Sequence, residues 1–557
     1  MDVTSCLGLA ALEAFVLHKL SFGITSATAA TQILGLFLVH YLVLKYYRIV
    51  LYHKYVSPLR HLPGPKGGHF LLGQTVNVLR AETPTSLYIE WMRKWPDAPF
   101  IRYLGVGNRE FLLPNSLEAY KEVLQTQCYS FRKPDWFTRM TKEVIGKGLL
   151  SQEGEEHRAN RRMLNVPFSA ANTKKLEPLF KEKARGIGSV FDEAVSAGDD
   201  AGKTGVIDCT EIFSKATLDI MGVAVLGQEL SHLNTVQYKA KASDGAPTSI
   251  HHDNYSFYQA YHVFFSPGPV GKLLTFFNGF FPMRWLPLQA NREFKFAMKW
   301  LNATLTQVCR DRFREIRDAK KMNRYDGNAE SRDITTFMVE ESLPGGSIAG
   351  LSEEVFVGHL LQGMAAGHET SATVLSWSLL ILAQHQDIQQ KLRQEIETLF
   401  AHNSEPSYTE IENLDYLDNF IKENLRVYSP STTYHRQADR DVVIEGYRLP
   451  NGTCVDVCPS LAMLNPLIWG EDADKVDVTR WERLTSQQLN PFAFGAFSNG
   501  PRICIGRAFA LLEIKTILVE LVPKYRFLSV EKNYTVENPN LTLRPAGLEI
   551  RLEKIHS

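Results

Sequence analysis

Apolar residues recur at helical spacing over most of the chain beyond residue 70, whereas stretches that alternate like strands are short. The spacing predicts helices over 117–126, 153–164, 173–195, 294–322 and 387–399. Short strands are predicted over 100–103, 110–113, 442–444, 453–457 and 541–544. Two polar segments are predicted to be loops, 243–255 and 323–332. The pattern indicates one large domain that is mainly α with small β-sheets.

The longest predicted helix follows Ser352, which supplies a hydroxyl cap ahead of two glutamates. The helical pattern then runs without proline to about residue 384, roughly 33 residues or ~50 Å of helix, enough to cross a whole domain. Its middle holds Gly363, Gly367 and Thr370. An interior glycine costs up to ~1 kcal/mol relative to alanine. The two glycines therefore indicate either that something occupies the space of a side chain or that another helix packs closely there.

No Asp, Glu, Lys or Arg occurs over 21–44, a stretch long enough to cross the ~30 Å hydrocarbon layer as a helix. Gln32 and His40 make it less apolar than an ideal span. The alternatives are a cleaved secretory signal, which would begin earlier and behind a basic region, and a buried or interfacial helix. We predict a membrane anchor. A weaker apolar stretch over 6–17 is interrupted by Glu13, and it either lies in the interface or forms a second membrane segment.

Basic residues gather directly behind this anchor, at Lys45, Arg48, Lys54, Arg60 and Lys66. The positive-inside bias places the rest of the chain in the cytosol, after a single pass through the endoplasmic reticulum membrane. Alternating Pro and Gly over 62–68 prevent a helix from continuing there. The predicted division is a lumenal or interfacial N-terminus (1–20), an anchor (21–44), a basic stretch with a hinge (45–68) and a catalytic domain (69–557).

Composition narrows the possible partners. The 557-residue chain carries 61 Lys+Arg and 61 Asp+Glu, so its formal net charge is zero. That balance argues against a nucleic-acid partner, for which a basic excess is typical. The seven cysteines are scattered and odd in number, which indicates reduced thiols rather than a disulfide framework.

One of these cysteines, Cys504, lies in a distinctive segment. Phe497 and Gly500 precede it, Gly506 follows it, and an apolar helix is predicted from about residue 508. The glycines allow a tight turn whose N–H groups point at the sulfur, and the helix N-terminus also favours a thiolate. The residues alone are compatible with a buried structural cysteine, with the nucleophile of a Cys-His hydrolase and with a metal ligand. A zinc site is disfavoured because no second Cys or His lies at short spacing.

The pattern Phe497-x-x-Gly500-x-Arg502-x-Cys504-x-Gly506 resembles the haem-binding signature of the cytochrome P450 family. The resemblance extends over about residues 60–550. Segment 366–370 is similar to the oxygen-activating motif of the family, and segment 156–168 is similar to its fungal members. Further matches are the pair Glu423-x-x-Arg426 and its arginine partner Arg480. Two positions depart from the family: His157, four residues before Arg161, replaces the usual Trp, and Val478 replaces a Pro.

The resemblance implies a haem b whose iron is bound by the Cys504 thiolate. It implies that Gly506 moderates the charge on the sulfur and that Phe497 packs beside it. Arg161 and Arg502 are the first candidates to bind the haem propionates, because guanidinium pairs well with carboxylate. His157 is the next candidate, followed by His435 or Arg436.

The resemblance also implies roles on the other side of the haem. Glu369 and Thr370 are expected to relay protons, and Gly367 to open room above the haem. A threonine in a helix often bonds only its own i−4 carbonyl, which here belongs to Ala366. Away from the haem, a buried ion network is expected to support the cysteine loop; its members are Glu423, Arg426 and Arg480.

The implied activity is a monooxygenase that uses O2 and two electrons to hydroxylate or epoxidise an apolar small molecule of fungal secondary metabolism. NADPH is expected to supply the electrons through a separate membrane-bound cytochrome P450 reductase, facing Arg158, Arg161 and Arg162. A haem isomerase, dehydratase or synthase is an alternative, as is a non-catalytic membrane haem protein that binds ligands; the adjacent Glu369 and Thr370 favour the monooxygenase. Substrate recognition is expected near 133–145, 255–288 and 431–435.

Overall fold

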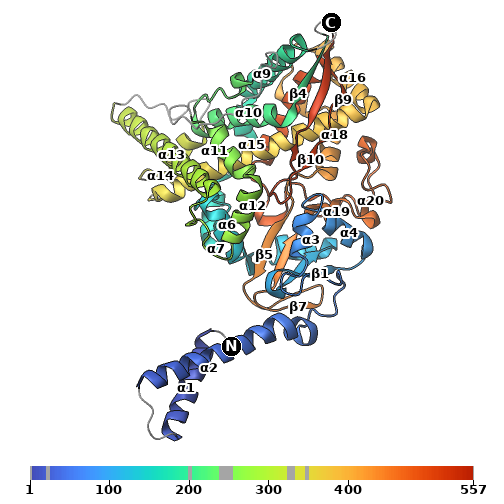
Figure 1. The fold of residues 1–557 in the computed structure, drawn as a ribbon. Helices are drawn as coiled ribbons and strands as arrows, with labels where there is room; N and C mark the ends of the chain where they lie inside the picture. Colours follow the sequence, from blue (N-terminus) through green and yellow to red (C-terminus); the bar gives the residue numbers. More distant parts are fainter. Residues whose placement is uncertain are drawn as a thin grey trace.

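The computed structural model describes residues 3–20, 26–198, 203–236, 255–322, 333–344, 346 and 350–555. Figure 1 shows a broad, mostly helical body and, outside it, a pair of N-terminal helices. The predicted loop 323–332 lies outside the described residues, as does all of 243–255 except its last residue.

The N-terminal helices are α1 (Val3–Leu20) and α2 (Ser26–Tyr46), which pack against each other. A π-helical segment, η1 (Tyr47–Val56), continues α2 without a break, so most of the predicted basic stretch is helical. Within the described residues, one helix is long and apolar enough to cross a membrane, Ala30–Val56, and Thr4–Leu17 is a shorter apolar helix.

The helices of the body follow the predicted pattern closely. As far as residue 198 they are α3 (Thr75–Arg80), α4 (Ser86–Lys94), α5 (Leu117–Lys121), its continuation η3 (Glu122–Thr126), α6 (Asp135–Ile145), α7 (Gly154–Leu164), α8 (Ala170–Lys174) and α9 (Glu177–Ser196). The later ones are α10 (Cys209–Met221), η5 (Gly222–Leu226), α11 (Phe257–Phe265), α12 (Gly268–Asn278), α13 (Gln289–Lys321), α14 (Ile334–Ser342), α15 (Glu353–Gln384), α16 (Gln386–His402), α17 (Tyr408–Glu412), α18 (Asp415–Val427), η8 (Val478–Glu482), α19 (Pro459–Met463), α20 (Pro466–Trp469) and α21 (Arg507–Leu521).

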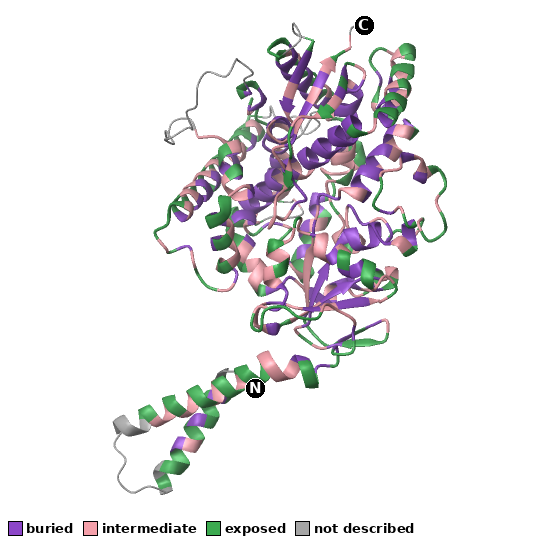
Figure 2. Ribbon diagram, turned by 45° about the vertical axis from the view of Figure 1, so that its right-hand side comes forward, coloured by how far each residue is buried: buried purple, intermediate pink, exposed green. Residues whose placement is uncertain are grey.

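The long helix α15 crosses the middle of the body as predicted (Figure 1). Its start is fixed by Ser352, whose hydroxyl accepts a hydrogen bond from the Val355 N–H at 3.4 Å. Helices α10, α13, α18 and α21 contact it, and most of its residues are buried (Figure 2). The helix is therefore enclosed over most of its length and forms the centre of the core.

The sheets are small and lie at two ends of the body. The first has the order β1 (Phe100–Leu104), β2 (Glu110–Pro114), β8 (Cys454–Val457), β5 (Tyr434–Ala438) and β3 (Phe131–Arg132). The second has the order β4 (Thr204–Asp208), β12 (Glu549–Lys554) and β9 (Tyr525–Val530). Two hairpin-like pairs complete the set: β6 (Val442–Ile444) with β7 (Tyr447–Leu449), and β10 (Thr535–Val536) with β11 (Pro545–Ala546).

Two predicted elements differ from the structure. The predicted helix 173–195 is divided, because α8 ends at Lys174 and α9 begins at Glu177 with Pro178 in its first turn, where proline needs no N–H partner. The predicted strand 541–544 is wrong, since only an isolated bridge joins Thr542 to Ser431. The strand pattern there reflects burial of Leu543 in a loop rather than a ladder of hydrogen bonds.

Candidate functional site

The segment around Cys504 forms a tight loop that leads directly into α21. The Cys504 N–H donates to the Phe497 carbonyl at 2.8 Å, which closes the loop. Gly500 has a φ of +71°, and a Cβ there would lie 2.2 Å from the carbonyl oxygen of Leu124. Only glycine fits that position. Gly506 is the N-cap residue of α21, so the cysteine lies two residues before the helix cap.

Cys504 is the one exposed cysteine among the seven, all of which are described. The surrounding protein raises the pKa of its thiol, whereas the Gly506 N–H and the side chains of Arg161 and Arg507 favour the thiolate. The N-terminus of α21 acts in the same direction. No cluster of three or more His, Cys, Asp or Glu able to hold a metal occurs in the described part of the chain. Cys504 would therefore contribute a single ligand to a metal whose other ligands do not come from such a cluster.

One face of α15 is open where the rest of the helix is buried. Between residues 356 and 383, the residues that are not buried are Gly363, Ala366, Gly367 and Thr370. Their spacing of three and four places them on one face of the helix. Thr370 Oγ1 donates to the Ala366 carbonyl at 2.7 Å, the local bond considered for a helical threonine. This open stripe lies on the helix that α21 also contacts.

The two glycines of α15 face different neighbours. A Cβ at Gly367 would lie 2.4 Å from the sulfur of Met221 on α10, so a side chain there would displace the end of that methionine. A Cβ at Gly363 would lie 3.7 Å from Val225, which is an ordinary contact distance. Close packing is thus visible at Gly367 alone, and the opening of room by Gly367 stays a prediction.

Glu369 points away from the open stripe into a buried cradle. Thr542 Oγ1 lies 3.3 Å from Glu369 Oε1, and Arg544 Nη1 lies 3.6 Å from the same oxygen. Burial raises the pKa of Glu369, whereas Arg544 and Thr542 oppose that rise. The sequence did not predict Thr542 or Arg544 as site residues. They come from a C-terminal loop, and no local pattern in the sequence connects them with α15.

A cluster of basic side chains surrounds one carboxylate beside the cysteine loop. Lys133 Nζ lies 2.7 Å from Glu153 Oε1, and Arg502 Nη2 hydrogen-bonds Glu153 Oε2. Arg436 lies within electrostatic reach of Arg502 and Glu153, and burial lowers its pKa. Burial, assisted by Arg502 and Lys133, lowers the pKa of His157 to about 4, so its ring is neutral at pH 7. The structure thus brings together three predicted residues, Arg502, Arg436 and His157.

Lys133 joins this cluster although it was predicted only to border a recognition segment. Burial lowers its pKa to about 8, with Arg502 and Arg436 adding to the effect and Glu153 opposing it. Arg502 Nε is buried without a hydrogen-bond partner among the described residues. Three cationic side chains and one neutral imidazole around a single carboxylate leave an excess of positive charge.

These observations fit the haem that the sequence resemblance implies. The excess of positive charge suits two propionate groups, since bidentate arginine–carboxylate pairs are the strongest of such contacts. The exposed Cys504 thiol, with N–H and arginine neighbours, suits a single axial ligand. The open stripe of α15 supplies small side chains where a flat group needs room.

Arg161 and Phe497 lie against the cysteine loop itself. Arg161 Nη1 donates to the Ile503 carbonyl at 2.6 Å and so ties α7 to the loop. The Arg507 guanidinium lies 5.8 Å from the centre of the Phe497 ring. The structure therefore places Arg161 next to the sulfur, whereas its contact with a propionate stays a prediction.

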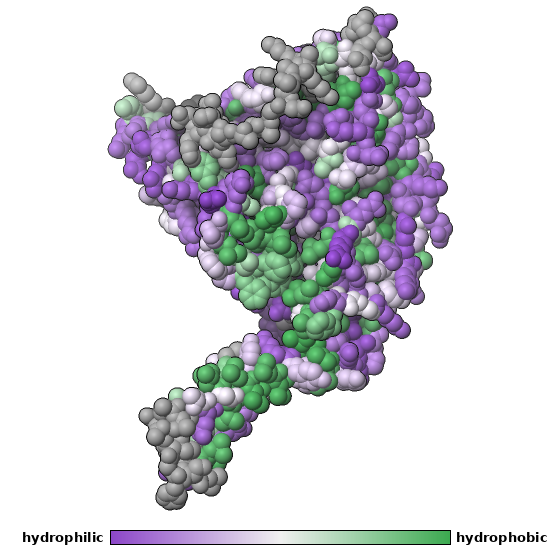
Figure 3. All heavy atoms as spheres, in the orientation of Figure 1, coloured by the Kyte–Doolittle hydropathy of each residue, from purple (hydrophilic) through white to green (hydrophobic). Residues whose placement is uncertain are grey.

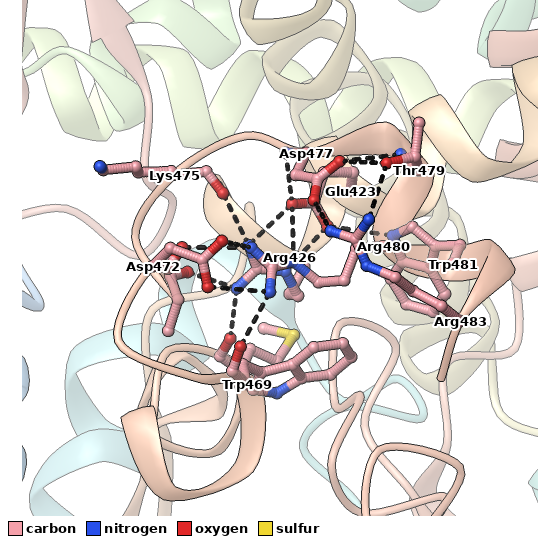
Figure 4. Close-up of polar contacts among 12 residues, drawn as sticks. Glu423, Arg426, Trp469, Asp472, Lys475, Asp477, Thr479, Arg480, Trp481 and Arg483 are labelled. Carbon is pink, nitrogen blue, oxygen red and sulfur yellow. Dashed lines mark hydrogen bonds and ion pairs between the residues drawn. The ribbon is translucent and has the colours of Figure 1, made fainter. Parts of the chain in front are cut away.

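The structure brings the three residues of the predicted ion network into direct contact (Figure 4). Arg426 and Glu423 are fully buried and form two parallel hydrogen bonds of 2.8 Å. Arg480 Nε lies 3.5 Å from Glu423 Oε1. The Trp481 indole and the Asp477 N–H also donate to Glu423, at 3.0 and 2.9 Å. This carboxylate is thus surrounded by donors on all sides, as a buried charge requires.

The same network holds segment 463–480, which precedes the cysteine loop in the chain. Arg426 donates to the carbonyls of Met463 and Lys475, at 2.8 and 3.0 Å. Arg480 donates to the Trp469 carbonyl at 2.8 Å and pairs with Asp472 at 3.0 Å. The arginines therefore join α18 to segment 463–480 through its backbone carbonyls. Side-chain substitutions in that segment would leave these backbone contacts in place.

A large surface cavity lies elsewhere, between the end of the N-terminal helices and the body. It has a volume of about 910 Å³ and includes neither Cys504 nor Thr370 among its lining residues. Aromatic side chains from two predicted recognition segments line it, Trp136, Phe276 and Phe280. His435 also lines it, and its Nδ1 lies 2.7 Å from Asp456 Oδ1. His435 is therefore paired with a carboxylate of this cavity, which leaves Arg436 as the better of the two propionate candidates.

The chain is similar to known proteins in family, in sequence and in structure. The family model described as Cytochrome P450 matches residues 62–552. The chain is 28% identical over 534 residues to Cytochrome P450 monooxygenase sphH of Aspergillus fumigatus, covering 94% of this chain and 92% of that protein. It is 26% identical to Cytochrome P450 monooxygenase FUM15 of Gibberella moniliformis, covering 91% and 90%. A cytochrome P450DA haem domain is structurally similar, with a TM-score of 0.68 at 20% identity, covering 89% of this chain and 98% of that one.

Proposed function

Since this chain belongs to the cytochrome P450 family and is a cytochrome P450 monooxygenase, we propose that it hydroxylates or epoxidises an apolar small molecule of fungal secondary metabolism. The observation that carries the proposal is the combination of one exposed cysteine, Cys504, with an open stripe on α15 that ends at Thr370. Relatives from three fungi, each named a cytochrome P450 monooxygenase, support the reaction class. The proposal names the chemical class of the substrate, an apolar small molecule.

Each part of the proposed haem site has a named role. Cys504 would bind the iron, and Arg502, Arg436, Lys133 and His157 would hold the propionates. When bound, the haem supplies the oxygen-activating chemistry of the family, with the thiolate favouring O–O cleavage. Gly506 would hold a hydrogen bond to the sulfur and so moderate its charge.

Two side chains of α15 would manage protons. Thr370 Oγ1 faces the open stripe and would hold a water or a proton at that atom. Glu369 would supply the proton from its buried cradle, because burial raises the pKa of its carboxyl and so keeps the acid form accessible. The presence of both groups favours the monooxygenase over an isomerase, dehydratase or synthase, which needs no external oxygen, and over a haem protein that only binds ligands.

The surroundings of the site suggest how substrate and electrons arrive. We propose that α2 anchors the chain in the endoplasmic reticulum membrane with the body in the cytosol, and that a membrane-bound NADPH–cytochrome P450 reductase supplies electrons. Apolar side chains gather on the anchor helices and on the side of the body that carries α12 (Figure 3), including the exposed Val270, Leu273, Phe277 and Phe281. An apolar substrate dissolved in lipid would meet the aromatic cavity at this surface.

A spectroscopic experiment tests the proposal directly. The reduced, CO-bound chain is expected to show the Soret band of a thiolate-ligated haem, and Cys504→Ser is expected to lose it. Cys309→Ser, in which the replaced cysteine is buried on α13, is the matched control and should keep the band. Turnover of an apolar substrate should then require both NADPH and O2. A thiolate band that persists in Cys504→Ser would contradict the assignment.

A further inference from the structure

The two N-terminal helices each contain one ionisable residue in the middle of an apolar run, Glu13 in α1 and His40 in α2. The structure places these two side chains together: His40 Nε2 lies 3.2 Å from Glu13 Oε1. His40 Nδ1 donates to the Leu36 carbonyl at 2.7 Å, so Nε2 is the atom left to face the carboxyl group. A single proton between Nε2 and the carboxyl satisfies both groups.

The contact between the helices has a regular pattern around this pair. On α1 the buried residues recur every fourth position, at Cys6, Ala10 and Ala14 (Figure 2). On α2 the half-buried positions recur at helical spacing, with Ile33, Leu36, Phe37, His40 and Tyr41 on one face. Small residues at every fourth position let two helices approach closely, an arrangement common between helices within membranes.

The outer faces of both helices are apolar. Large exposed side chains cover α1 away from the contact, and others cover α2 in the same way (Figure 3): Leu7, Leu12, Phe15, Val16, Leu17, Leu34, Leu38, Val39, Leu42 and Val43. The 18 residues of α1 span ~27 Å at 1.5 Å per residue, and the 21 residues of α2 span ~32 Å. Both lengths match the ~30 Å hydrocarbon layer.

We infer that α1 and α2 insert into the membrane together as a helical hairpin, with lipid covering their outer faces and the Glu13–His40 pair closing their contact. This inference rests on the proposed membrane anchoring. Five residues join the end of α1 to the start of α2, so two packed helices with this connection run antiparallel. The N-terminal end of α1 then lies on the same side of the membrane as the catalytic body, in the cytosol.

The pair explains why neither segment is an ideal membrane span by itself. A lone carboxylate at mid-membrane is strongly disfavoured, and ionisable residues in membranes are found facing a partner in the protein. Glu13 makes α1 a poor single span, and His40 weakens α2 in the same way. Packed together, the two groups pair with each other, although 44% of the Glu13 side chain and 24% of the His40 side chain stay exposed. A paired acid and imidazole cost less in lipid than either group alone, so the hairpin is a better membrane insert than either helix by itself.

The side on which the N-terminal end of α1 lies decides between the hairpin and a single pass. The full chain is expressed with an N-terminal epitope tag that carries a glycosylation sequon, and sealed microsomes are treated with protease. The hairpin predicts that the tag is digested without detergent and is never glycosylated, like an epitope at the C-terminus. A tag that is protected or glycosylated while the body is digested would overturn the hairpin and leave the anchor intact. Release of the chain by alkaline carbonate would instead refute the anchoring itself.

Cysteine cross-linking tests the contact independently. In a Cys6→Ala background, Glu13→Cys combined with His40→Cys is expected to form an intramolecular disulfide in oxidised membranes, seen after cleavage at a protease site inserted between α1 and α2. Leu12→Cys with Leu42→Cys is the matched control, because both positions face outward. At least a fivefold greater yield for the first pair is expected. Equal yields, together with a lumenal tag, would overturn the inference.

Discussion

The neighbouring residues Glu369 and Thr370 have opposite surroundings, and this difference bears on how a proton reaches the haem side of α15. Thr370 lies on the open stripe, whereas Glu369 is buried beside Thr542 and Arg544. The carboxyl group and the hydroxyl group therefore have different neighbours. We propose that Arg544 is a positioning residue, which acts on the reaction only through Glu369.

Replacing Arg544 tests this positioning role. Arg544→Met leaves the Glu369 carboxyl without its cation, so its pKa, already raised by burial, should rise further. We expect normal haem content but a several-fold loss of product formed per NADPH consumed, with the balance appearing as peroxide. Arg544→Lys, which keeps the charge, should recover most of the coupling. Full coupling in Arg544→Met would show that Glu369 acts without this partner.

Glu513 on α21 makes the free energy of unfolding depend on pH, and it has no role in the proposed reaction. It is fully buried, neither carboxyl oxygen has a well-formed hydrogen bond within the described residues, and burial raises its pKa from 4.5 to about 8. Between these two pH values the folded chain retains a proton that the unfolded chain releases. The free energy of unfolding therefore falls as the pH rises through this window.

Glu513→Gln should remove that dependence. Relative to the parent chain, the variant is expected to gain on the order of a few kcal/mol of stability between pH 5 and pH 8, because each unit of pKa shift corresponds to about 1.4 kcal/mol. Urea unfolding at a series of pH values measures the difference. Glu482→Gln, on the exposed surface, is the control and should leave the profile unchanged. Parallel profiles for Glu513→Gln and the parent would contradict a buried, protonated acid.

Site residues that lie within one short segment could be predicted from the sequence, whereas residues that meet only in the folded chain could not. Cys504, Gly500 and Gly506 could be predicted because one short segment contains the whole loop. Lys133 and Arg544 could not be predicted, since each meets its partner only through tertiary packing across a large separation in sequence. Periodicity records which face of an element is buried, but it does not record which distant loop covers that face.

At the scale of elements, α15 was predictable because its cap, its length and its lack of proline are all local features. The sheet β4–β12–β9 was not predicted. Strands β9 and β12 alternate buried with less buried residues, but β4 pairs with β12 across most of the chain, and local alternation does not identify so distant a partner. The division of 173–195 into two helices was also not predicted from the local sequence. Pro178 lies in the first turn of α9, so it starts a new helix instead of ending one.

The buried ion network that joins α18 to segment 463–480 leads to a prediction about folding. Glu423→Ala would strand two arginines, Arg426 and Arg480, which are almost completely buried around it. Removing one partner of a buried ion pair costs about 3–5 kcal/mol. We expect apoprotein or aggregate in place of a slow enzyme, measured as haem per chain and as soluble yield. Glu482→Ala in the adjacent exposed turn is the control, and a stable, haem-loaded Glu423→Ala would refute the supporting role.

At the scale of the whole molecule, the zero net charge conceals an uneven distribution of basic residues. Some lie on the membrane-proximal helix, and others lie near the cysteine loop, where Arg161 contacts Ile503. Arg162 and Arg507 are exposed in the same region, one next to Arg161 in α7 and the other at the start of α21. We call Arg162 and Arg507 the loop-side basic pair. We expect an electron donor that approaches Cys504 to meet this pair.

Reversing one of these charges tests whether the reductase docks there. Arg162→Glu should slow reduction of the haem several-fold at low ionic strength, because exposed charges steer association more than they hold a complex together. The deficit should shrink as salt rises, since the Debye length falls to about 8 Å at physiological ionic strength. Stopped-flow reduction by NADPH–cytochrome P450 reductase under CO measures the rate without any substrate. Lys391→Glu, exposed on α16, is the matched control and should reduce normally. A salt-independent loss in Arg162→Glu, or an equal loss in both variants, would place the docking surface elsewhere.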